Sequence, residues 1–280
     1  ESIFIQLYQI LSNNTAYSHL YGHLNYCGLT IIIVYRSKIM SLDILITVAV
    51  VSFIQSIFGV GILLLGTPLL MLQGYNFHQS VIVLLPISLL INLFQIFKDQ
   101  SALDLDFYKK ILIYTVPFIV IFLIFISKAE INISILIGII LLIVSAKDFS
   151  KRVNKVLNLF VSYEKSYLII MGIVHGLTNL GGSLLTMIVY AKDYEKRKIR
   201  VTIAASYATF AAFQIVTLLV SGFDIDIKLS MILLSLTVGL AIFIATEKMI
   251  FAYINAEAYR KLFSGFIFLS GLLLIVKSVY

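Results

Sequence analysis

The chain has 280 residues, of which 60% are hydrophobic and only 12% are charged, and its mean hydropathy is +1.03. A soluble domain is about half apolar and a quarter charged, so this composition excludes a soluble globular protein and predicts a multi-pass protein of the lipid bilayer. The formal net charge of +7 does not indicate nucleic-acid binding, because the basic residues lie in short loops between apolar segments, where they orient a membrane protein.

Residues 1–39 differ from the rest of the chain. They contain polar, tyrosine-rich stretches at 12–15 and 19–25, and their apolar stretch at 28–34 is too short to span a bilayer. They also lack the basic region and small-residue cleavage site of a secretory signal. Because Met40 directly precedes the first long apolar run, we expect residues 1–39 to be a poorly ordered or misassigned extension. Residues 40–280 are expected to form a single membrane domain.

A series of apolar segments follows Met40, and most of them are apolar on every face, as helices surrounded by lipid or by other helices should be. The sequence therefore predicts an all-α polytopic membrane protein. The segments lie at about 42–58, 62–73, 79–97, 109–127, 131–147, 166–179, 183–191, 201–221, 229–246 and 260–277.

Two of the apolar regions are interrupted by glycines and polar side chains. The first interruption runs from Gln55 to Pro68, and the second from His175 to Ser183. Glycine lowers helix propensity, and an open backbone group must find a partner inside a membrane. A break of this kind at membrane depth is typical of a functional site.

The distribution of lysine and arginine over the loops predicts the topology. The loops at 74–80, 127–132 and 221–228 are poor in basic residues and are expected outside the cell, whereas the basic loops are expected in the cytoplasm. Only about 26 residues, 166–191, separate two basic and hence cytoplasmic segments, whereas two full crossings need about 40. This segment must therefore enter the membrane, break near Asn179–Gly182 and return.

Each half of the domain thus contains one broken hairpin and three spans. An odd number of crossings gives the two halves opposite orientations, which is the inverted-repeat design of secondary transporters, with broken helices that meet near the midplane. Repeat 1 is expected at about 42–147, a cytoplasmic linker at 148–165 and repeat 2 at about 166–278.

A weak internal match supports the two repeats. Gln55 precedes Gly61 by six residues, and His175 precedes Gly181 by six. The triplet Phe-Gln-Ile that contains Gln95 recurs around Gln214 at nearly the same offset, about 120 residues.

At these residues the sequence resembles the TauE/SafE family of sulfite exporters, also called the TSUP family. Gly59 to Pro68 matches the glycine-rich segment and proline of the family's first hairpin, and 175–182 matches the glycine-rich segment that opens its second half. Arg197 to Ala212 matches its basic stretch and small-residue helix. The resemblance covers about 43–278, although the first glycine run is shorter than is usual in the family. It implies a permease of the bacterial inner (plasma) membrane for small anions such as sulfite, sulfoacetate or other organosulfonates.

Candidate substrate-binding residues lie at or near the two breaks. Glycines there can expose backbone N–H groups at half-helix N-termini, where the helix dipole favours an anion. Amides at membrane depth can donate N–H groups without a fixed charge. His175 is the only histidine expected well inside a span, and its titration near neutral pH suits proton coupling. The candidates are Gln55, Gly59, Gly61, Asn92, Gln95, His175, Asn179, Gly181, Gly182, Ser183 and Gln214.

The same residue types also have structural explanations, which the sequence leaves open. Glycines allow close helix packing, and buried amides form interhelical hydrogen bonds worth about 0.6–2 kcal/mol each. A neutral imidazole can bond to a neighbouring carbonyl, and hydroxyls such as those of Ser183, Ser206 and Thr209 more often bond back to their own helix. Besides His175, no ionisable residue is expected at membrane depth, and Glu247 is assigned to a loop.

The sequence predicts a permease that moves a small anion by alternating access of the two repeats. An anion-selective channel and a non-transport membrane subunit of a complex are the alternatives. No enzymatic activity, metal or cofactor is expected, since no Ser-His-Asp set, metal cluster or nucleotide loop is evident. The lone Cys27 permits no internal disulfide. The substrate, the direction of transport, the coupling ion and the oligomeric state, including a homodimer, stay open.

Overall fold

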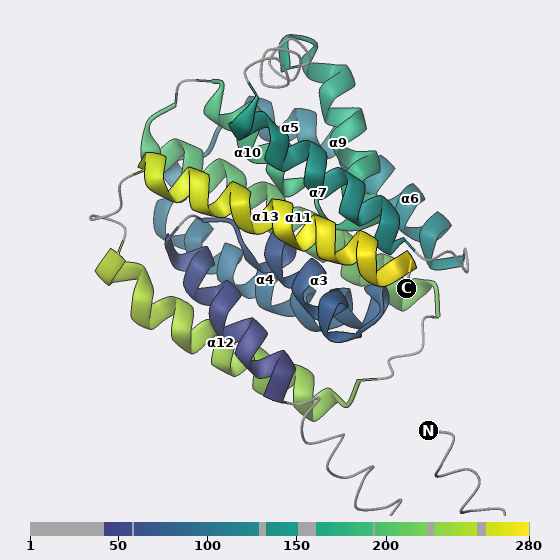
Figure 1. Ribbon diagram of the computed structural model, residues 1–280. Helices are drawn as coiled ribbons and strands as arrows, with labels where there is room; N and C mark the ends of the chain where they lie inside the picture. The colour runs from purple at the N-terminus through teal and green to yellow at the C-terminus, as the bar shows by residue number, and fades with distance from the viewer. Residues whose placement is uncertain are drawn as a thin grey trace, which may run out of the picture. The chain divides into compact units, whose positions relative to one another are not determined.

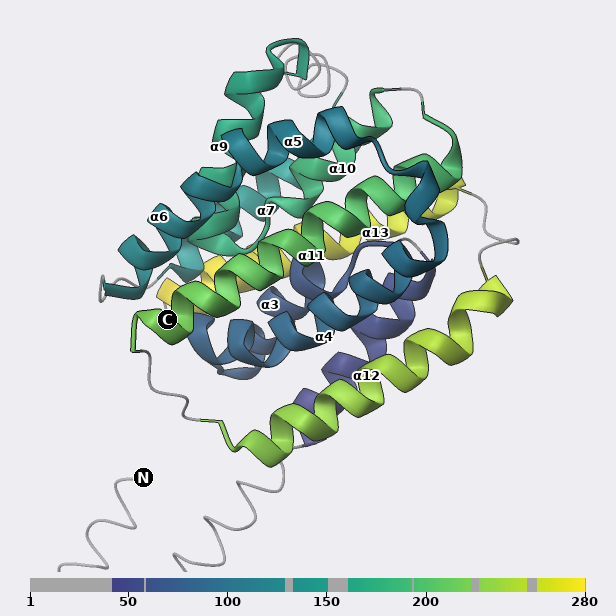
Figure 2. The same cartoon turned by 180° about the vertical axis from the view of Figure 1, so that it is seen from behind.

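The computed structural model describes residues 42–57, 59–128, 133–150, 161–192, 194–222, 227–250 and 256–279. Regular secondary structure within these ranges is entirely helical, which confirms the all-α prediction. Ile44–Tyr280 forms one compact unit, drawn from two sides in Figures 1 and 2. The extension expected at residues 1–39 lies outside the described residues.

The helices follow the predicted apolar segments closely, and their ends lie within a few residues of the expected ones. After the first helix, Leu42–Ile57, they are α3 (Ile62–Gln73), α4 (Phe77–Asp99), α5 (Leu105–Tyr114), α6 (Val116–Lys128), α7 (Ser134–Phe149), α9 (Glu164–Thr178), α10 (Gly182–Tyr190), α11 (Lys196–Val220), α12 (Leu229–Ile250) and α13 (Ala256–Val279).

Four helical stretches of the described part are long and apolar enough to cross a membrane: Phe77–Ala102, Leu105–Lys128, Arg197–Val220 and Leu229–Glu247. Large apolar side chains lie exposed on them, as lipid contact requires. Phe97 of α4 is 83% exposed, and Val220 of α11 is 82% exposed.

The predicted segment at 109–127 forms two helices instead of one. α5 ends at Tyr114 and α6 begins at Val116. Pro117 has no N–H to donate to the carbonyl four residues earlier, so the hydrogen-bond ladder is interrupted here. The hydroxyl of Thr115, the residue between the two helices, donates to the Leu168 carbonyl of α9 at 3.0 Å.

Long helices of the first half pack against long helices of the second. α4 lies along α11, α7 lies along α13, and α6 lies along α9. The dark teal α7 and the yellow α13 are neighbours in both views (Figures 1 and 2).

Glycines allow the closest approach between α7 and α13. A Cβ atom added to Gly138 would lie 2.5 Å from Cγ1 of Ile275, and one added to Gly271 would lie 2.8 Å from the Gly138 carbonyl oxygen. Small residues at such interfaces let backbones approach closely in a membrane. Gly172 and Gly176 of α9 approach the α6 side of the bundle in the same way.

Charged side chains of several loops meet at one end of the bundle, here called the basic end. Lys110 and Lys192 both pair with Glu164, at 2.9 and 3.0 Å, and Arg197 pairs with Asp99 at 2.8 Å. Burial alone would raise the pKa of Glu164, but the two lysines lower it on balance. The loops that the charge distribution assigned to one side of the membrane thus lie together.

A Gly271→Ala change should loosen the contact between α7 and α13, because the new methyl group meets the Gly138 carbonyl. On heating, we expect the detergent-solubilised variant to lose its monodisperse chromatographic peak at a temperature several degrees below that of the natural protein. Gly265→Ala is the matched control on the same helix, since nothing lies within 4 Å of its added Cβ. The control should keep or raise stability, as alanine is the better helix former by about 1 kcal/mol. Equal stabilities of the two variants would contradict the close packing.

Candidate functional site

The first break is closed by the side chain of Gln55. Gly59 has a left-handed backbone (φ +71°) and donates its N–H to the Gln55 carbonyl at 2.8 Å, which ends the first helix. The Gln55 Nε2 donates to the Gly59 carbonyl at 2.9 Å, and its Oε1 accepts from the N–H of Ile62, the first residue of α3, at 3.2 Å. One amide therefore pairs backbone groups that a helix end would leave open inside a membrane.

The second break resembles the first at the end of its incoming helix. Asn179 has a left-handed backbone (φ +63°) and donates its N–H to the His175 carbonyl at 2.8 Å, which ends α9. Asparagine is one of the few residues besides glycine that adopts this conformation readily. The first α10 bond runs from the Leu185 N–H to the Gly181 carbonyl at 2.9 Å, as the corresponding α3 bond runs from Leu65 to Gly61 at 2.8 Å.

The two breaks thus correspond residue by residue at a constant offset. The corresponding pairs are Gln55 with His175, Gly59 with Asn179, and Gly61 with Gly181. The short match seen in the sequence has a counterpart in these backbone hydrogen bonds and in the left-handed conformation of Gly59 and Asn179, whereas Gly61 (φ 166°) and Gly181 (φ −59°) differ in conformation.

A chain of buried polar side chains connects the second break to α11 and to the first hairpin. Nε2 of His175 lies 3.2 Å from Oε1 of Gln214, and Gln214 Nε2 donates to Asn179 Oδ1 at 3.3 Å. Asn179 Nδ2 donates in turn to the hydroxyl of Thr67, in α3, at 3.1 Å. All four side chains are fully buried. The last bond means that the two broken hairpins touch in the interior.

Asn92 and Gln95 approach from α4, and they differ in how well they are paired. Asn92 Oδ1 accepts from Gln55 Nε2 at 3.4 Å, and its Nδ2 donates to the Ser88 carbonyl at 2.7 Å. Gln95, one turn further along, is 2% exposed, and neither its side-chain nitrogen nor its oxygen has a partner among the described residues. The predicted amides therefore form one cluster at each break, with Gln95 outside both.

The start of α10 faces Tyr207 of α11, a residue that the sequence did not single out. A Cβ atom on Gly182 would coincide with the Tyr207 hydroxyl oxygen, so only glycine leaves room for it. Tyr207 is buried, and within the described part of the chain its hydroxyl has no hydrogen-bond partner. The same holds for Nδ1 of His175, whose ring meets the Tyr207 ring edge to face at 6.2 Å.

We call His175, Gly181, Gly182 and Tyr207 the α10 site. The Tyr207 hydroxyl and His175 Nδ1, both without a partner among the described residues, belong to side chains that contact the start of α10 at Gly182 and Gly181. Of the first-turn N–H groups of α10, that of Ser183 already donates to the Leu180 carbonyl at 3.3 Å. Ser183 is less available, because its hydroxyl donates back to the Leu180 carbonyl at 3.1 Å.

Two hydroxyls of α11 also bond back to their own helix, which is the structural explanation given for them from the sequence. Ser206 donates to the Thr202 carbonyl at 2.7 Å, and Thr209 donates to the Ala205 carbonyl at 2.9 Å, both one turn back on the same helix. Tyr207 of the same helix was not selected from the sequence. It could have been found there as a polar aromatic residue within an otherwise small-residue stretch.

The placement of Glu247 in a loop is wrong. α12 continues to Ile250, so Glu247 lies inside this helix with its side chain only 3% exposed. It pairs with Lys98 of α4 at 2.8 Å and with Arg200 of α11. These helices extend beyond their predicted ends, which places Glu247 and most of the Arg200 side chain inside the packed bundle, while Lys98 lies at its surface.

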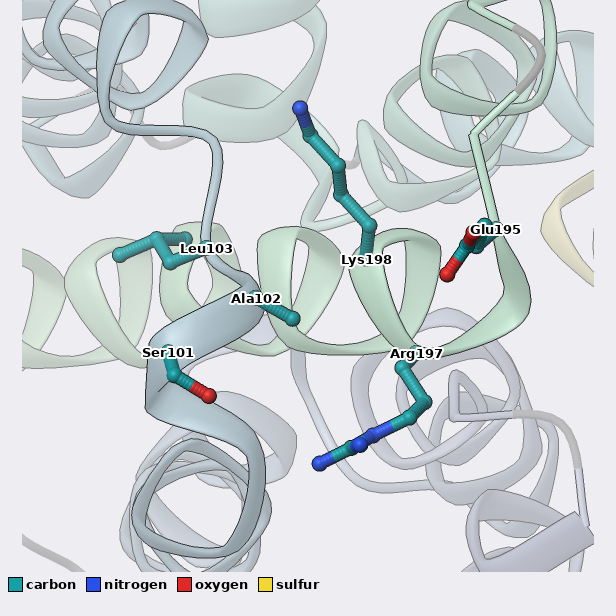
Figure 3. A pocket seen from close by; sticks show the side chains of 6 residues that line it. All are labelled: Ser101, Ala102, Leu103, Glu195, Arg197 and Lys198. Carbon is teal, nitrogen blue, oxygen red and sulfur yellow. The ribbon is translucent and has the colours of Figure 1, made fainter.

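A surface hollow of about 340 Å³ lies at the basic end (Figure 3). None of the predicted site residues lines it, and its two cations are both paired, Arg197 with Asp99 and Lys198 with Asp104 at 3.7 Å. The residues around it are Ser101, Ala102, Leu103, Glu195, Arg197 and Lys198.

Asp104, which follows Leu103 at the edge of this hollow, forms hydrogen bonds to two neighbouring residues. It accepts hydrogen bonds from the Tyr194 hydroxyl and from the Phe107 N–H. Burial would raise the pKa of Asp104, but these bonds and the nearby lysines hold it below its usual value on balance. The carboxylate is therefore charged at neutral pH, and the hollow presents mixed charge.

The comparison with known proteins agrees with the resemblance read from the sequence. A family model described as "Sulfite exporter TauE/SafE" matches residues 44–274. No curated protein and no solved structure matches the chain. The family match includes both breaks and the polar residues around them, and it extends over most of the sequence. The chain therefore belongs to the sulfite exporter TauE/SafE family.

Proposed function

We propose that this protein is a secondary-active permease that binds a small anion between its two broken hairpins, near the membrane midplane, and moves it by alternating access. The family is one of membrane transporters of the sulfite-exporter type and not of enzymes. The substrate, the binding site and the transport cycle are our proposals.

The observation that carries the proposal is the α10 site. The N-terminus of α10 offers N–H groups and the positive end of a helix dipole, which favour an anion. The Tyr207 hydroxyl, which is buried and bonds to none of the residues that the structure describes, supplies a further donor beside Gly182. A compact oxyanion such as sulfite, a sulfonate or a carboxylate has several acceptor oxygens and can satisfy these donors together.

Paired helix contacts support the inverted-repeat arrangement of 42–147 and 166–278. α4 packs on α11 and α7 on α13, and the contact of α11 with α6 has its counterpart in that of α4 with α12. The contact of α6 with α9 has a counterpart between α12 and the first helix, where the Thr246 hydroxyl donates to Ser56 at 2.7 Å. Such exchanged pairs are expected of two repeats related by an axis in the membrane plane.

The filling of both breaks favours a carrier over an open channel. The Gln55 amide occupies the first break, and the Tyr207 hydroxyl lies against the second. An anion would enter only after these groups move, which suits alternating access. Under the positive-inside rule the basic end faces the cytoplasm of a bacterial plasma membrane.

Purified protein in proteoliposomes should carry radiolabelled sulfite and show counterflow. Unlabelled sulfite inside the vesicles should accelerate uptake, because a carrier returns faster when loaded. Sulfite, methanesulfonate, sulfate and acetate form the panel. A lack of flux for all four anions would contradict the permease, and fast flux without counterflow would identify a channel.

A Tyr207→Phe change removes only the hydroxyl at the α10 site. Because that hydroxyl has no partner among the described residues, its loss should leave thermal stability unchanged or slightly higher. The KM for sulfite should rise roughly tenfold, corresponding to about 1.4 kcal/mol of lost binding. Tyr167→Phe is the matched control, since that hydroxyl donates to the Leu184 carbonyl at 2.8 Å. The control should lower stability, and an unchanged KM in Tyr207→Phe would remove the hydroxyl from the site.

A His175→Gln change tests proton coupling. Glutamine can still donate to Gln214, but it cannot take up a proton. Flux of methanesulfonate, whose own charge is constant between about pH 5 and 8, should depend on pH in the natural protein and lose that dependence in the variant. His78→Gln, at the opposite end of α4 from the basic end, is the control and should keep the natural profile. If both variants keep it, His175 is structural.

A further inference from the structure

The chain of polar side chains that joins the second break to the first hairpin has a direction. Asn179 Nδ2 donates to the Thr67 hydroxyl at 3.1 Å, and Gln214 Nε2 donates to Asn179 Oδ1 at 3.3 Å. The Gln214 amide therefore turns its Oε1 toward Nε2 of His175, 3.2 Å away. An amide oxygen has no proton to give, so Nε2 of His175 is the donor in this bond.

This direction decides the state of the other ring nitrogen of His175. A neutral imidazole carries one proton, so a proton on Nε2 leaves Nδ1 as a bare acceptor. Nδ1 is buried and has no partner among the described residues. The start of α10 presses against this side chain, since a Cβ atom on Gly181 would lie 2.5 Å from Cβ of His175. A lone pair in the α10 site repels the oxygens of an anion, whereas an N–H group attracts them.

The chain has a second self-consistent arrangement, in which every bond is reversed. Each side chain would then donate toward His175, and the proton of the neutral imidazole would sit on Nδ1. The direction of the chain and the position of this proton are therefore tied together. The observed direction ends on Thr67, in the other hairpin, so a contact between the two hairpins takes part in keeping Nδ1 without a proton.

The described surroundings of His175 supply no charge that would balance a second proton. Its ring contacts the rings of Tyr207 and Phe210, and Tyr207 is the titratable side chain that faces it from α11. α3 and α10 contain no Asp, Glu, Lys or Arg. The charged side chains of the other helices around it lie in the first two turns of α9 and α11, at the last residue of α6, and on α5. A lone imidazolium is costly at such depth.

We propose that the anion and one proton enter the α10 site together, with the proton on Nδ1 of His175, and that Thr67, Asn179 and Gln214 are positioning residues that enforce this coupling. The imidazolium is the counter-ion of the anion and donates its Nδ1–H to one of the anion's oxygens. The proton comes from water on the side where the anion enters and leaves with the anion on the other side. The inference rests on the proposed permease function and names its coupling ion.

Each charge needs the other in this site. The anion without the proton meets the lone pair of Nδ1, and the proton without the anion has no counter-ion. A shift of the existing proton from Nε2 to Nδ1 would give an N–H group without proton uptake. The chain opposes that shift, because all three of its hydrogen bonds would have to reverse together.

Electroneutral transport is the first consequence to measure. Methanesulfonate carries one constant negative charge, so its movement with one proton transfers no net charge. In proteoliposomes with a trapped pH-sensitive dye, uptake should acidify the interior by one proton per anion. A membrane potential imposed with potassium and valinomycin should leave the initial rate unchanged. A rate that follows the potential, without acidification, would overturn the inference.

The proton positions can be read from histidine side chains labelled with ¹⁵N in the full chain, because protonated and bare ring nitrogens differ widely in chemical shift. The spectrum of His175→Gln identifies the His175 signals among the four histidines. At neutral pH we expect a proton on Nε2 alone without anion, and protons on both nitrogens with methanesulfonate. A proton on Nδ1 alone, in either state, would overturn the inference, since the chain would then run the other way.

Asn179→Gly separates positioning from structural support. Glycine adopts the left-handed turn readily and stands at the corresponding position of the first break, Gly59, so the fold should survive. Without the middle link, the Gln214 amide can turn over. The anion-free variant should therefore show both neutral forms of His175, and fewer than one proton should move per methanesulfonate. A proton on Nε2 alone in this variant would overturn the positioning role.

Two further variants complete the test. Thr67→Val keeps the shape of the side chain but removes the acceptor at the end of the chain, so it should also show both forms of His175. It decides the question if Asn179→Gly fails to fold. Gln95→Leu is the control for the spectrum, because Gln95 lies in the same Phe-Gln-Ile triplet and has no partner among the described residues. It should leave the His175 signals unchanged.

The outcomes distinguish this inference from the permease itself. Methanesulfonate uptake that follows the membrane potential would overturn proton coupling at His175 and leave the permease standing. Absence of flux for sulfite, methanesulfonate, sulfate and acetate would overturn the permease and the coupling together.

Discussion

A helix that stops inside a membrane leaves N–H and C=O groups that no water can reach, and each must find a protein partner. Both hairpins of this protein meet that requirement, in different ways. The Gln55 side chain pairs the backbone on either side of the first break, so this break is satisfied within its own hairpin. At the second break a left-handed Asn179 closes the helix with its backbone, which leaves its side chain available to α3 and α11. The interior polar network exists because of that difference.

The two breaks consequently differ in the chemistry that surrounds them. The α10 site is uncharged apart from what His175 can take up, and its donors are a hydroxyl and backbone N–H groups. The first break adjoins Arg200 and Glu247, so charge dominates there.

Hydropathy located the helices to within a few residues, because lipid demands continuous apolar segments in any helical membrane fold. The breaks at Gln55 and His175 were also evident, since glycine and amides at depth are unusual enough to be seen in one dimension. Tyr207 and Glu247 were missed, because their surroundings come from helices far away in sequence. The sequence could not show that Gln214 is hydrogen-bonded while Gln95 has no partner among the described residues, because both glutamines have the same neighbours in the chain.

The hydrogen bond from Asn179 to Thr67 limits how such a carrier can move. If each repeat rocked as one rigid body, this bond between the two hairpins would have to break in every cycle, inside a medium that offers no water to replace it. A movement that keeps the hairpins joined, and shifts them together against the α4–α11 and α7–α13 pairs, would not break this bond. The hairpins would then be the travelling part and the paired long helices the fixed frame, an elevator and not a rocker switch.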